Sequence, residues 1–432
     1  MMNENKQIVI DMGSSRISVM ATEVLESGEV RILSEESKKS NDIRYGVVEQ
    51  HTEAAHTITR LVRLLQNSAH LPQVNSLCVS LNAKTMKQVP VRIHRARVPN
   101  RTVTNNLING MLSECKSKFN QLDVDVLDII PLYYDIDGRK TKSPIGQNAD
   151  NITGFYNVIV GSIYIKQEIE RAFERTMAFT PHPYSPLGIE ALSTVLLEEN
   201  ERQNGCALIN FGAMTTTLGI YKEGVLQQLM VVGLGGLNIT KDIESLGISE
   251  DNAEKLKCLK GCALNSLVSY PIRIKIPSAT GEDYLNIDTD FLATIIEARL
   301  TEILTPILHE IQAQFTELEG GIIITGGGAK LNNILDFLEE KTGLPVRYGD
   351  HSEWLSEDTD ERFYDPVYSQ AVGTAVLLNE YQKEHPEIKT EQTENKENKT
   401  DKKNQKVKFT EKITSGITNK ILRLFEDDNY LK

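Results

Sequence analysis

One short pattern occurs twice in this chain and constrains its fold more than any other feature. Residues 8–20 consist of an apolar run, an Asp-x-Gly turn of small residues and a second apolar run. Residues 207–221 repeat this order with Asn-x-Gly in place of Asp-x-Gly. A glycine turn and a further apolar run follow each copy, which predicts a β-meander closed by a hairpin. Because the copies are far apart, we expect two similar α/β domains whose turns face each other across a cleft.

The residues of the first turn are suited to binding a phosphate group. Gly13 has no Cβ, and Ser14 and Ser15 are small, so successive main-chain N–H groups are free to form an anion-binding nest. Asp11, at the end of the first run, is placed to hold a hydrated Mg²⁺ beside that phosphate. The corresponding candidates in the second copy are Asn210, Gly212, Thr215 and Thr216. A single meander of this kind is more often plain structure, and it is the repeat that favours a phosphate site.

Two further glycine-rich stretches are candidates for ligand contact. Gly235 and Gly236 permit a sharp turn before a helix. Further along, a buried strand runs into Gly326, Gly327 and Gly328, whose bare backbone would let a flat ligand lie against it. Tight packing of a strand against a helix explains such a turn equally well, so the glycines alone do not decide between the two.

The composition is that of a folded protein with more than one domain. The chain has 432 residues, of which 40% are hydrophobic and 25% charged, and its net charge is −13. This length provides two or more cores, and the acidic balance disfavours a general nucleic-acid binder. The start lacks the pattern of a secretory signal, and no apolar run approaches the ~20 residues of a membrane-spanning helix. The five cysteines have neither metal nor disulfide spacing, so we expect packing thiols in a reducing cytoplasm.

The segments between the motifs predict helices and an inserted unit. Residues 83–163 combine apolar strands with a helix near residues 105–118, which predicts a small α+β subdomain inside the first domain. Ser249 is a good N-cap for the acidic turn that follows it. Further helices are predicted over residues 52–66, 165–177, 187–199, 291–314 (interrupted near Pro306) and 370–380.

The last fifty residues change in character. Residues 383–407 contain almost no apolar side chain, so they predict a flexible tether. An apolar stripe at helical spacing follows and predicts an amphipathic helix for a membrane surface or a partner groove, with docking on its own domain as the alternative. The members of the stripe are Phe409, Ile413, Ile417, Ile421, Leu424 and Phe425. One copy of so short a helix would bind a membrane marginally, whereas several copies on an oligomer would bind firmly.

Taken in order, these stretches resemble the actin/Hsp70/sugar-kinase ATPase superfamily, and within it the FtsA family of bacterial cell division. The resemblance rests on the two phosphate turns, on residues 235–243 with 253–257, on the glycines before Lys330, on residues 295–299, and on the insert and tail. It implies an α/β, actin-like two-domain ATPase fold with an inserted α+β subdomain, a disordered linker and a C-terminal amphipathic helix.

The resemblance also implies a division of the chain into named parts. The two domains are subdivided into 1A and 1C, and into 2A and 2B. The implied ranges are 1–82 (first part of 1A), 83–163 (1C), 164–203 (rest of 1A), 204–241 (first part of 2A), 242–300 (2B), 301–382 (rest of 2A and the closing helix of 1A), 383–407 (linker) and 408–426 (membrane-targeting helix).

The same resemblance implies the ligands and the partners. ATP with Mg²⁺ would occupy the cleft, and Glu254 and Lys257 would contact the adenosine together with the glycine stretches and Lys330. The protein would assemble with itself at the cytoplasmic face of the inner membrane, as a peripheral protein of the division septum. Residues 242–300 would receive the FtsZ C-terminal peptide, with Arg299 as the candidate cation. An exposed helix arginine without a role is an equally good account of Arg299. Other divisome proteins are implied partners, and nucleic acid is not.

The second turn departs from the family pattern in a way that bears on catalysis. The family's usual Asp-x-Gly-Gly-Gly-Thr-Thr-Asp is replaced by a stretch that begins at Asn210 and ends at Thr217, so both carboxylates are missing. Such groups hold the Mg²⁺ shell and orient the attacking water. Arg16 stands where many relatives have lysine, and it is still able to contact a phosphate. We therefore expect the nucleotide to act mainly as a structural ligand, with slow or absent hydrolysis.

Three other functions of the same superfamily are alternatives. A small-molecule kinase would need a carboxylate in the cleft as base, and the second turn has lost its acids. A chaperone ATPase would need a β-rich domain, and none is predicted after residue 380. A pilus-assembly ATPase fits most of the chain but is a poorer match to the terminal amphipathic helix.

Overall fold

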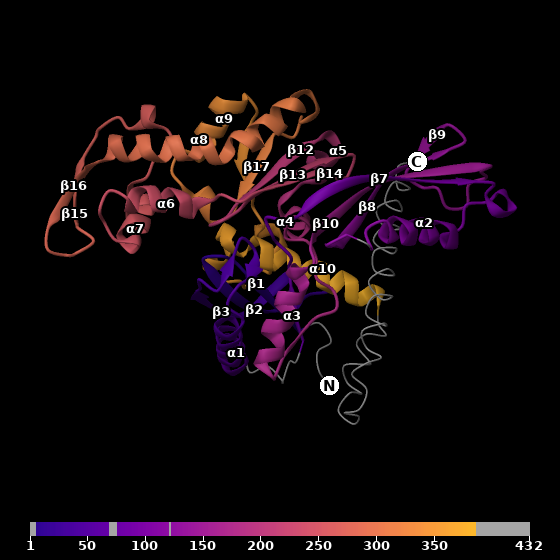
Figure 1. Cartoon of the computed structure of the whole chain (residues 1–432), viewed down its shortest axis with the longest axis horizontal. Helices are drawn as coiled ribbons and strands as arrows, with labels where there is room; N and C mark the ends of the chain where they lie inside the picture. The colour runs from indigo at the N-terminus through magenta and orange to yellow at the C-terminus, as the bar shows by residue number, and fades with distance from the viewer. Residues whose placement is uncertain (1–5, 69–75, 121, 386–432) are drawn as a thin grey trace.

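The computed structural model describes residues 6–68, 76–120 and 122–385. The predicted linker from residue 386 onward and the apolar stripe of residues 409–425 lie outside the described residues. The described part is built around two sheets that lie one above the other in Figure 1, with helices between them and on their outer faces.

The two sheets have the same strand order and the same strand directions. The first runs β11-β6-β1-β2-β3 and the second β18-β17-β12-β13-β14, each with an antiparallel meander on one side and parallel strands on the other. The first contains β1 (Lys6–Met12), β2 (Arg16–Val24), β3 (Val30–Lys39), β6 (Ser76–Val79) and β11 (Thr180–Pro181). The second contains β12 (Cys206–Phe211), β13 (Thr216–Lys222), β14 (Val225–Val232), β17 (Ile322–Thr325) and β18 (Val346–Tyr348).

The internal repeat extends to irregularities of the strands. The β2–β3 ladder shifts register between Ala21 and Thr22, and the β13–β14 ladder shifts between Ile220 and Tyr221. The spacing between these two register shifts equals the spacing between Gly13 and Gly212. The turn, the strand order and the bulge are therefore all copied, which confirms the repeat seen in the sequence.

Two helices fill the space between the sheets. Helix α10 (Ser369–Glu384) packs on β1 and β2 of the first sheet, and α4 (Gly188–Leu196) packs on β12 and β13 of the second. The two helices also pack on each other, so closely that a Cβ on Gly373 would lie 1.8 Å from the Ala191 carbonyl oxygen. Most of α10 is therefore buried, which explains why its sequence is apolar around nearly its whole circumference.

Other helices cover the outer faces of the sheets. Helices α1 (His51–Ser68) and α3 (Tyr164–Thr176) pack together below the first sheet, and the short α5 (Glu199–Asn204) leads into β12. Above the second sheet lie α8 (Thr289–Ala313) and α9 (Ile334–Thr342), the latter ended by Gly343 with φ 72°. The small ladder of β4 (Ile43–Arg44) and β5 (Val47–Val48) precedes α1.

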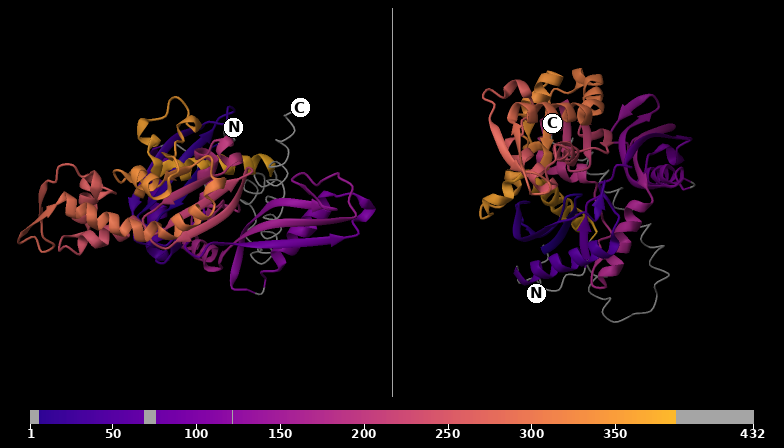
Figure 2. Two further views of the ribbon diagram at one scale, coloured as in Figure 1. Left: turned by 90° about the horizontal axis from the view of Figure 1, so that it is seen from above. Right: turned by 60° about the vertical axis from the view of Figure 1, so that its left-hand side comes forward.

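Two smaller units project at opposite ends of the molecule (Figure 2, left). The insert holds the antiparallel sheet β7-β10-β8-β9, and α2 covers one face of it. Its elements are β7 (Lys87–Ala96), α2 (Asn105–Ser117), β8 (Val124–Ile136), β9 (Arg139–Thr141) and β10 (Asn151–Ser162). The other unit holds α6 (Gly236–Glu244), α7 (Glu250–Lys260), β15 (Arg273–Pro277) and β16 (Tyr284–Asp288). Short 3₁₀ turns span Pro99–Arg101, Asn265–Leu267, Phe315–Glu317, Gly327–Lys330, Ser352–Trp354, Glu361–Tyr364 and Pro366–Tyr368.

Two of the predicted helices differ from the structure. The helix expected over residues 187–199 ends at Leu196, and α5 starts anew with Glu198 and Glu201 as a reciprocal cap. The predicted interruption of the long helix at Pro306 is wrong, because α8 continues through it. Proline has no N–H to donate to the Glu302 carbonyl, and both residues are on the exposed side of the helix, where this carbonyl is accessible to solvent. In the described part of the chain, no helix has the length and apolarity needed to cross a bilayer.

Candidate functional site

The two predicted phosphate turns follow β1 and β12 and have the same backbone geometry. A Cβ on Gly13 would lie 2.9 Å from the Arg16 carbonyl oxygen, and one on Gly212 would lie 2.8 Å from that of Thr215. The Gly212 N–H donates to this same Thr215 oxygen at 2.9 Å. Glycine is therefore required at both positions by the closeness of the turn itself.

Asp11 lies at the end of β1 and is held by the last helix of the fold. The Gln370 amide donates to Asp11 Oδ1 at 2.9 Å and to the Ser80 hydroxyl at 2.9 Å. Burial raises the pKa of Asp11 to about 6, against the opposing effect of the Arg16 guanidinium. The role of Gln370 was not predicted from the sequence. The one feature that could have indicated it is its polar side chain at the start of the apolar helix α10.

Arg16 lies beside the ring of Tyr368, which was not predicted to be part of the site. Its guanidinium carbon is 5.3 Å from the centre of the Tyr368 ring, a cation–π distance. Tyr368 directly precedes α10. Gln370 and Tyr368, the two contacts of the first turn that were not predicted, therefore both come from the segment that contains α10.

The second turn is held from beneath by the third glycine stretch. Asn210 pairs in parallel register with Thr325, and Gly326 follows with φ 90°. A Cβ on Gly326 would lie 2.5 Å from Asn210 Oδ1, and one on Gly328 would lie 2.6 Å from the Phe211 ring. Close packing therefore accounts for these two glycines.

Gly327 differs from its neighbours. A Cβ added to it would meet no atom of the described residues within 4 Å, and its φ is not positive. Neither packing nor backbone conformation explains a glycine there. Of the three predicted adenosine-site glycines, Gly327 is the one whose bare backbone faces open space.

The start of α6 also supports the second turn. A Cβ on Gly235 would lie 2.5 Å from the Gly212 carbonyl oxygen, which accepts the N–H of Gly236 at 2.9 Å. The next N–H, of Leu237, donates to the Ala213 carbonyl at 2.8 Å. Free N–H groups at this helix start are thus used to fix the turn.

Glu254 and Lys257, one turn apart on α7, form the predicted pair. The Lys257 ammonium donates to Glu254 Oε2 at 2.7 Å, to the Thr240 hydroxyl at 2.9 Å and to the Gly236 carbonyl at 3.0 Å. Burial acts to raise the pKa of Glu254, but Lys257 and the Thr240 hydroxyl hold it below its usual value. The pair therefore joins α6 to α7 beside the second turn. Thr240 was not among the predicted site residues.

Lys330 makes an ion pair across the two halves of the molecule. Its ammonium contacts the Asp365 carboxylate, which belongs to the segment that leads into α10. A second pair of this kind joins Lys39 of β3 to Asp251 of α7, at 2.9 Å. Two ion pairs thus bridge the two halves.

Arg299 lies on α8, away from these turns, and is already engaged. Its guanidinium makes a two-point contact with the Asp242 carboxylate and a further contact with Glu302. Only a quarter of its side chain is exposed. The structure therefore gives Arg299 a role in joining α6 to α8.

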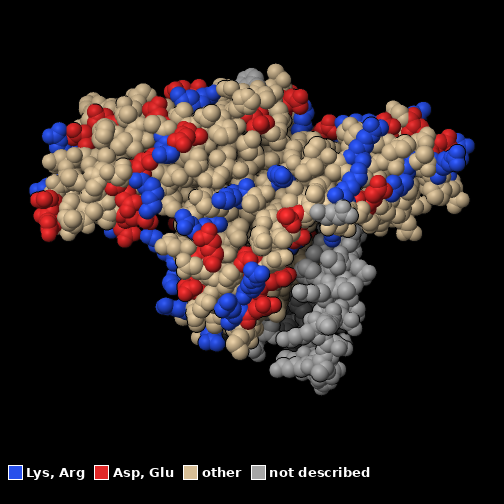
Figure 3. All heavy atoms as spheres, viewed as in Figure 1, with Lys and Arg blue, Asp and Glu red and all other residues tan. Residues whose placement is uncertain are grey.

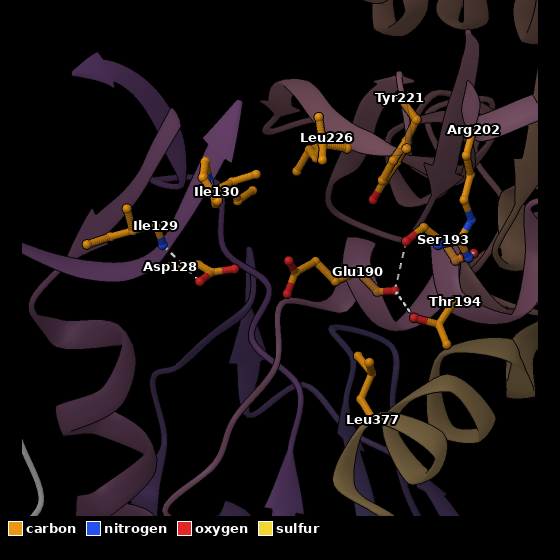
Figure 4. A pocket seen from close by; sticks show the side chains of 13 residues that line it. Asp128, Ile129, Ile130, Glu190, Ser193, Thr194, Arg202, Tyr221, Leu226 and Leu377 are labelled. Carbon is orange, nitrogen blue, oxygen red and sulfur yellow. Dashed lines mark hydrogen bonds between the residues drawn. The ribbon is translucent and has the colours of Figure 1, made fainter. Parts of the chain in front are cut away.

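A separate cavity of about 90 Å³ lies where the insert meets both halves. Figure 4 shows the carboxyl groups of Asp128, from β8, and Glu190, from α4, pointing toward one another across it. The β13–β14 hairpin and Leu377 of α10 complete the wall. This cavity was not predicted, because its lining comes from segments that are far apart in the chain.

Asp11 is the one residue that the sequence proposed for a metal ion, and it lies at the first turn. Among the described residues there is no cluster of three His, Cys, Asp or Glu side chains that could hold a metal ion. Asp11 is the candidate that the structure places beside a phosphate turn, and a nucleotide-bound Mg²⁺ needs few protein ligands because phosphate and water supply the others.

Comparison with known proteins agrees with the resemblance seen in the sequence. The family model described as cell division protein FtsA matches residues 207–373. The cell division protein FtsA of Porphyromonas gingivalis is 29% identical over 78% of this chain and 70% of its own length. Those of Borreliella burgdorferi and Escherichia coli K12 are each 26% identical, over 88% and 84% of this chain and 93% and 88% of their own lengths. The chain is a homologue of FtsA.

Solved structures agree on the fold. The PilM–PilN type IV pilus biogenesis complex matches with a TM-score of 0.62 and 13% identity, over 86% of this chain and 97% of that chain. MreB5 of Spiroplasma citri bound to ADP matches with a TM-score of 0.54 and 11% identity, over 88% and 98%. At such low sequence identities, structural similarity supports a shared fold and nothing more. The actin-like fold expected from the sequence is confirmed for this FtsA homologue.

Proposed function

We propose that this chain is an actin-like cell-division protein that binds ATP in its cleft, assembles on the membrane at the division septum and tethers FtsZ there. The observation that carries the proposal is the pair of copied phosphate turns, each followed by supporting elements, in a chain homologous to FtsA. The homology supports the cell-division role. The two turns support the proposal that the protein binds a nucleotide.

The nucleotide would act chiefly to hold the two halves together. Phosphates would lie between the turns at Gly13 and Gly212, and the adenosine would lie against Gly327 on the side of α7. A bound Mg²⁺ would neutralise phosphate charge beside Asp11. Asn210 provides no carboxylate on the other side, so hydrolysis is expected to be slow.

A nucleotide titration tests this part of the proposal. A fluorescent ATP analogue is titrated into the full chain while phosphate release is followed in parallel. We expect saturable binding, displaced by ATP, with less than about one phosphate per protein per minute. Failure of the analogue to bind would contradict the proposal, and brisk phosphate transfer to a small hydroxyl compound would favour a kinase.

Membrane attachment is proposed from the sequence of the tail. In a helix, Ile417 and Ile421 would lie on the apolar stripe, whereas Ser415 and Asn419 would lie on the opposite side. Anionic liposomes are therefore co-sedimented with the full chain, with an Ile417→Asp/Ile421→Asp variant and with a Ser415→Asp/Asn419→Asp control. We expect the stripe variant to stay in the supernatant and the control to pellet with the wild type. If both variants lost membrane binding equally, the added negative charge would explain the loss and the apolar stripe would not.

The unit that contains α6, α7 and the β15–β16 ladder is the proposed receiver of the FtsZ C-terminal peptide. It carries a group of exposed apolar side chains, which support a peptide contact better than the engaged Arg299 does. For Arg299 to bind the peptide it would have to leave Asp242. The exposed group comprises Leu259, Leu267, Tyr270, Ile272, Tyr284 and Phe291.

A matched pair of substitutions tests the peptide site. Tyr270 is 89% exposed, and Met177, in the other half of the molecule, is 94% exposed. Binding of a labelled FtsZ C-terminal peptide is compared for Tyr270→Asp and Met177→Asp. We expect Tyr270→Asp alone to weaken binding, by about tenfold. An equal loss in both variants, or in neither, would argue against this surface.

Self-assembly and recruitment of further divisome proteins are proposed on the homology to FtsA. On the same homology, the proposed location is the cytoplasmic face of the inner membrane. Electron microscopy of the liposome samples with ATP would show ordered assemblies on the vesicles if the chain polymerises there.

A further inference from the structure

The insert differs in charge from the rest of the chain. Residues 83–163 contain 11 Lys and Arg against 7 Asp and Glu, whereas the whole chain contains 47 against 60. Figure 3 shows a band of Lys and Arg side chains across the lobe formed by β7, β8 and β10. A basic module in an acidic protein favours an acidic partner.

A row of four side chains crosses the insert's sheet from edge to edge. Phe155 of β10 is directly opposite both Arg92 of β7 and Tyr133 of β8. The Phe155 and Tyr133 rings stack with centres 4.4 Å apart, and the Arg92 guanidinium lies 5.4 Å from the Phe155 ring. At the far edge, the Lys140 ammonium of β9 lies 4.6 Å from the Tyr133 ring. The order is thus cation, ring, ring, cation.

The row lies on the face of the sheet that α2 does not cover. Neighbouring strand residues such as Tyr134 and Tyr156 point to the other face, where they pack under α2. Further along β10, Asn157 is buried and donates to the Gln227 carbonyl of β14 at 2.6 Å. The face is therefore closed at its inner end by β14, and the row lies just beyond that contact.

The two cations at the ends of the row have capacity for a ligand. No carboxylate contacts the Arg92 guanidinium among the residues that the structure describes. Lys140 is 55% exposed and lies 3.6 Å from Glu223, which Lys142 also contacts. A carboxylate arriving at either end would thus find a cation that is not buried in an existing pair.

We propose that this row, Arg92, Phe155, Tyr133 and Lys140, is a docking surface for an acidic peptide segment of a partner protein. Three strand spacings separate the edges of the sheet, which is about 14 Å. An extended peptide covers that length in about four residues, and alternate side chains face the same way. The partner is therefore an extended segment with two carboxylates four residues apart and an apolar side chain midway, which lies on the stacked rings.

The surface is independent of the nucleotide cleft and of the FtsZ-peptide site, so this proposal does not rest on the proposed function. Its competitor is a purely structural role, since cross-strand aromatic and cation–aromatic pairs stabilise sheets on their own. A structural role predicts a loss of stability on substitution and no ligand. The test therefore measures binding and folding in the same variants.

The probe is the labelled peptide Ser-Glu-Ser-Phe-Ser-Glu-Ser, compared with the same peptide carrying glutamine in place of both glutamates. Both are titrated into the full-length protein by fluorescence anisotropy at low salt. The row variant is Arg92→Gln/Lys140→Gln. The control variant is Lys87→Gln/Arg101→Gln, which removes the same charge from the insert: Lys87 pairs with Val160, whose side chain packs on the α2 side, and Arg101 lies outside the sheet.

We expect the glutamate peptide to bind the wild type and the control, and to bind the row variant about tenfold more weakly or not at all. The glutamine peptide should not bind, and all variants should melt together with the wild type. The proposal is overturned if the two peptides bind alike, if the row variant binds as the wild type does, or if the row variant unfolds early. Preferential binding of a ten-nucleotide oligothymidine over the glutamate peptide would also overturn it, in favour of a nucleic-acid surface.

Discussion

Asp11 combines two demands that oppose each other. A carboxylate at the end of β1 is useful beside phosphate and Mg²⁺ only when it is ionised, yet burial favours its neutral form. The Arg16 guanidinium offsets part of this cost, and the Gln370 amide holds the carboxyl group in place by donating to Oδ1. The first turn thus depends on a residue that enters from the last helix.

This conflict predicts an unusual pH dependence for Asp11→Asn without nucleotide. Above pH 6 the folded wild type must hold an ionised carboxylate that is less hydrated than in the unfolded chain, and this costs stability. Through this group, stability falls as the pH rises from about 4 to 6, so the Asn variant should be more stable at pH 7.5, by about 1–3 kcal/mol. Thermal midpoints measured from pH 7.5 to 4.5 should show this gain shrinking as wild-type Asp11 takes up its proton. The exposed Asp283→Asn, in the β15–β16 turn, is the control and should show no such trend.

The glycines of the third stretch allow packing and ligand contact to be separated. Gly326→Ala combines a positive φ with a contact of 2.5 Å, so it should lower the thermal midpoint clearly. Gly327→Ala has room for its methyl group, so it should fold normally and instead weaken nucleotide binding. If the Gly327→Ala variant bound ATP as tightly as the wild type, the proposal that the adenosine lies against Gly327 would be wrong.

At the scale of elements, α10 and α4 carry the connection between the two sheets. Their backbones touch where Gly373 faces the Ala191 carbonyl, which is closer than any side chain permits. Helix α10 carries Gln370 near its start, where it contacts Asp11, and Tyr381 in its last turn, where the Tyr381 ring stacks on those of Tyr184 and His385. Both ends of this helix are thus fixed by named contacts.

Gly373→Ala should therefore separate the two helices and cost about 3 kcal/mol or more. The matched control is Gly110→Ala, in the exposed part of α2, where a Cβ meets nothing within 4 Å. There the same change should stabilise the protein by about 0.5–1 kcal/mol. Melting curves of the two variants should move in opposite directions, and a neutral Gly373→Ala would show that the helices can slide apart cheaply.

What the sequence predicted at this scale depended on local signals. The meanders and the cap at Ser249 follow from residues close together in the chain, and the structure confirms them. Gln370 and Tyr368 were missed because they meet the first turn from more than three hundred residues away. Pro306 misled the prediction because the sequence does not say which side of a helix faces water.

At the scale of the whole molecule, two ion pairs bridge the halves beside the candidate cleft. Lys39–Asp251 and Lys330–Asp365 join surface side chains, so each contributes little to the stability of either half. Their effect falls on the relative position of the halves, because both pairs must break for the halves to separate.

Charge reversal of the Lys39 pair tests this. Lys39→Glu opposes closure, so bound nucleotide should dissociate faster, by up to about fivefold, in line with the small energy of exposed pairs. The double reversal Lys39→Glu/Asp251→Lys should restore the wild-type rate. Stopped-flow release of a fluorescent nucleotide measures both. If the double variant released nucleotide as fast as the single one, the effect would be one of net charge and not of this pair.

The copied turn also bears on how such a protein is able to change over generations. In both copies the backbone of the turn is constrained by a glycine, Gly13 or Gly212, that lies close to a main-chain oxygen. The two copies therefore differ at the residue before the turn, Asp11 in one and Asn210 in the other, while their backbones stay alike. In this molecule the scaffold and the chemistry are separate variables, so a change in one does not oblige a change in the other.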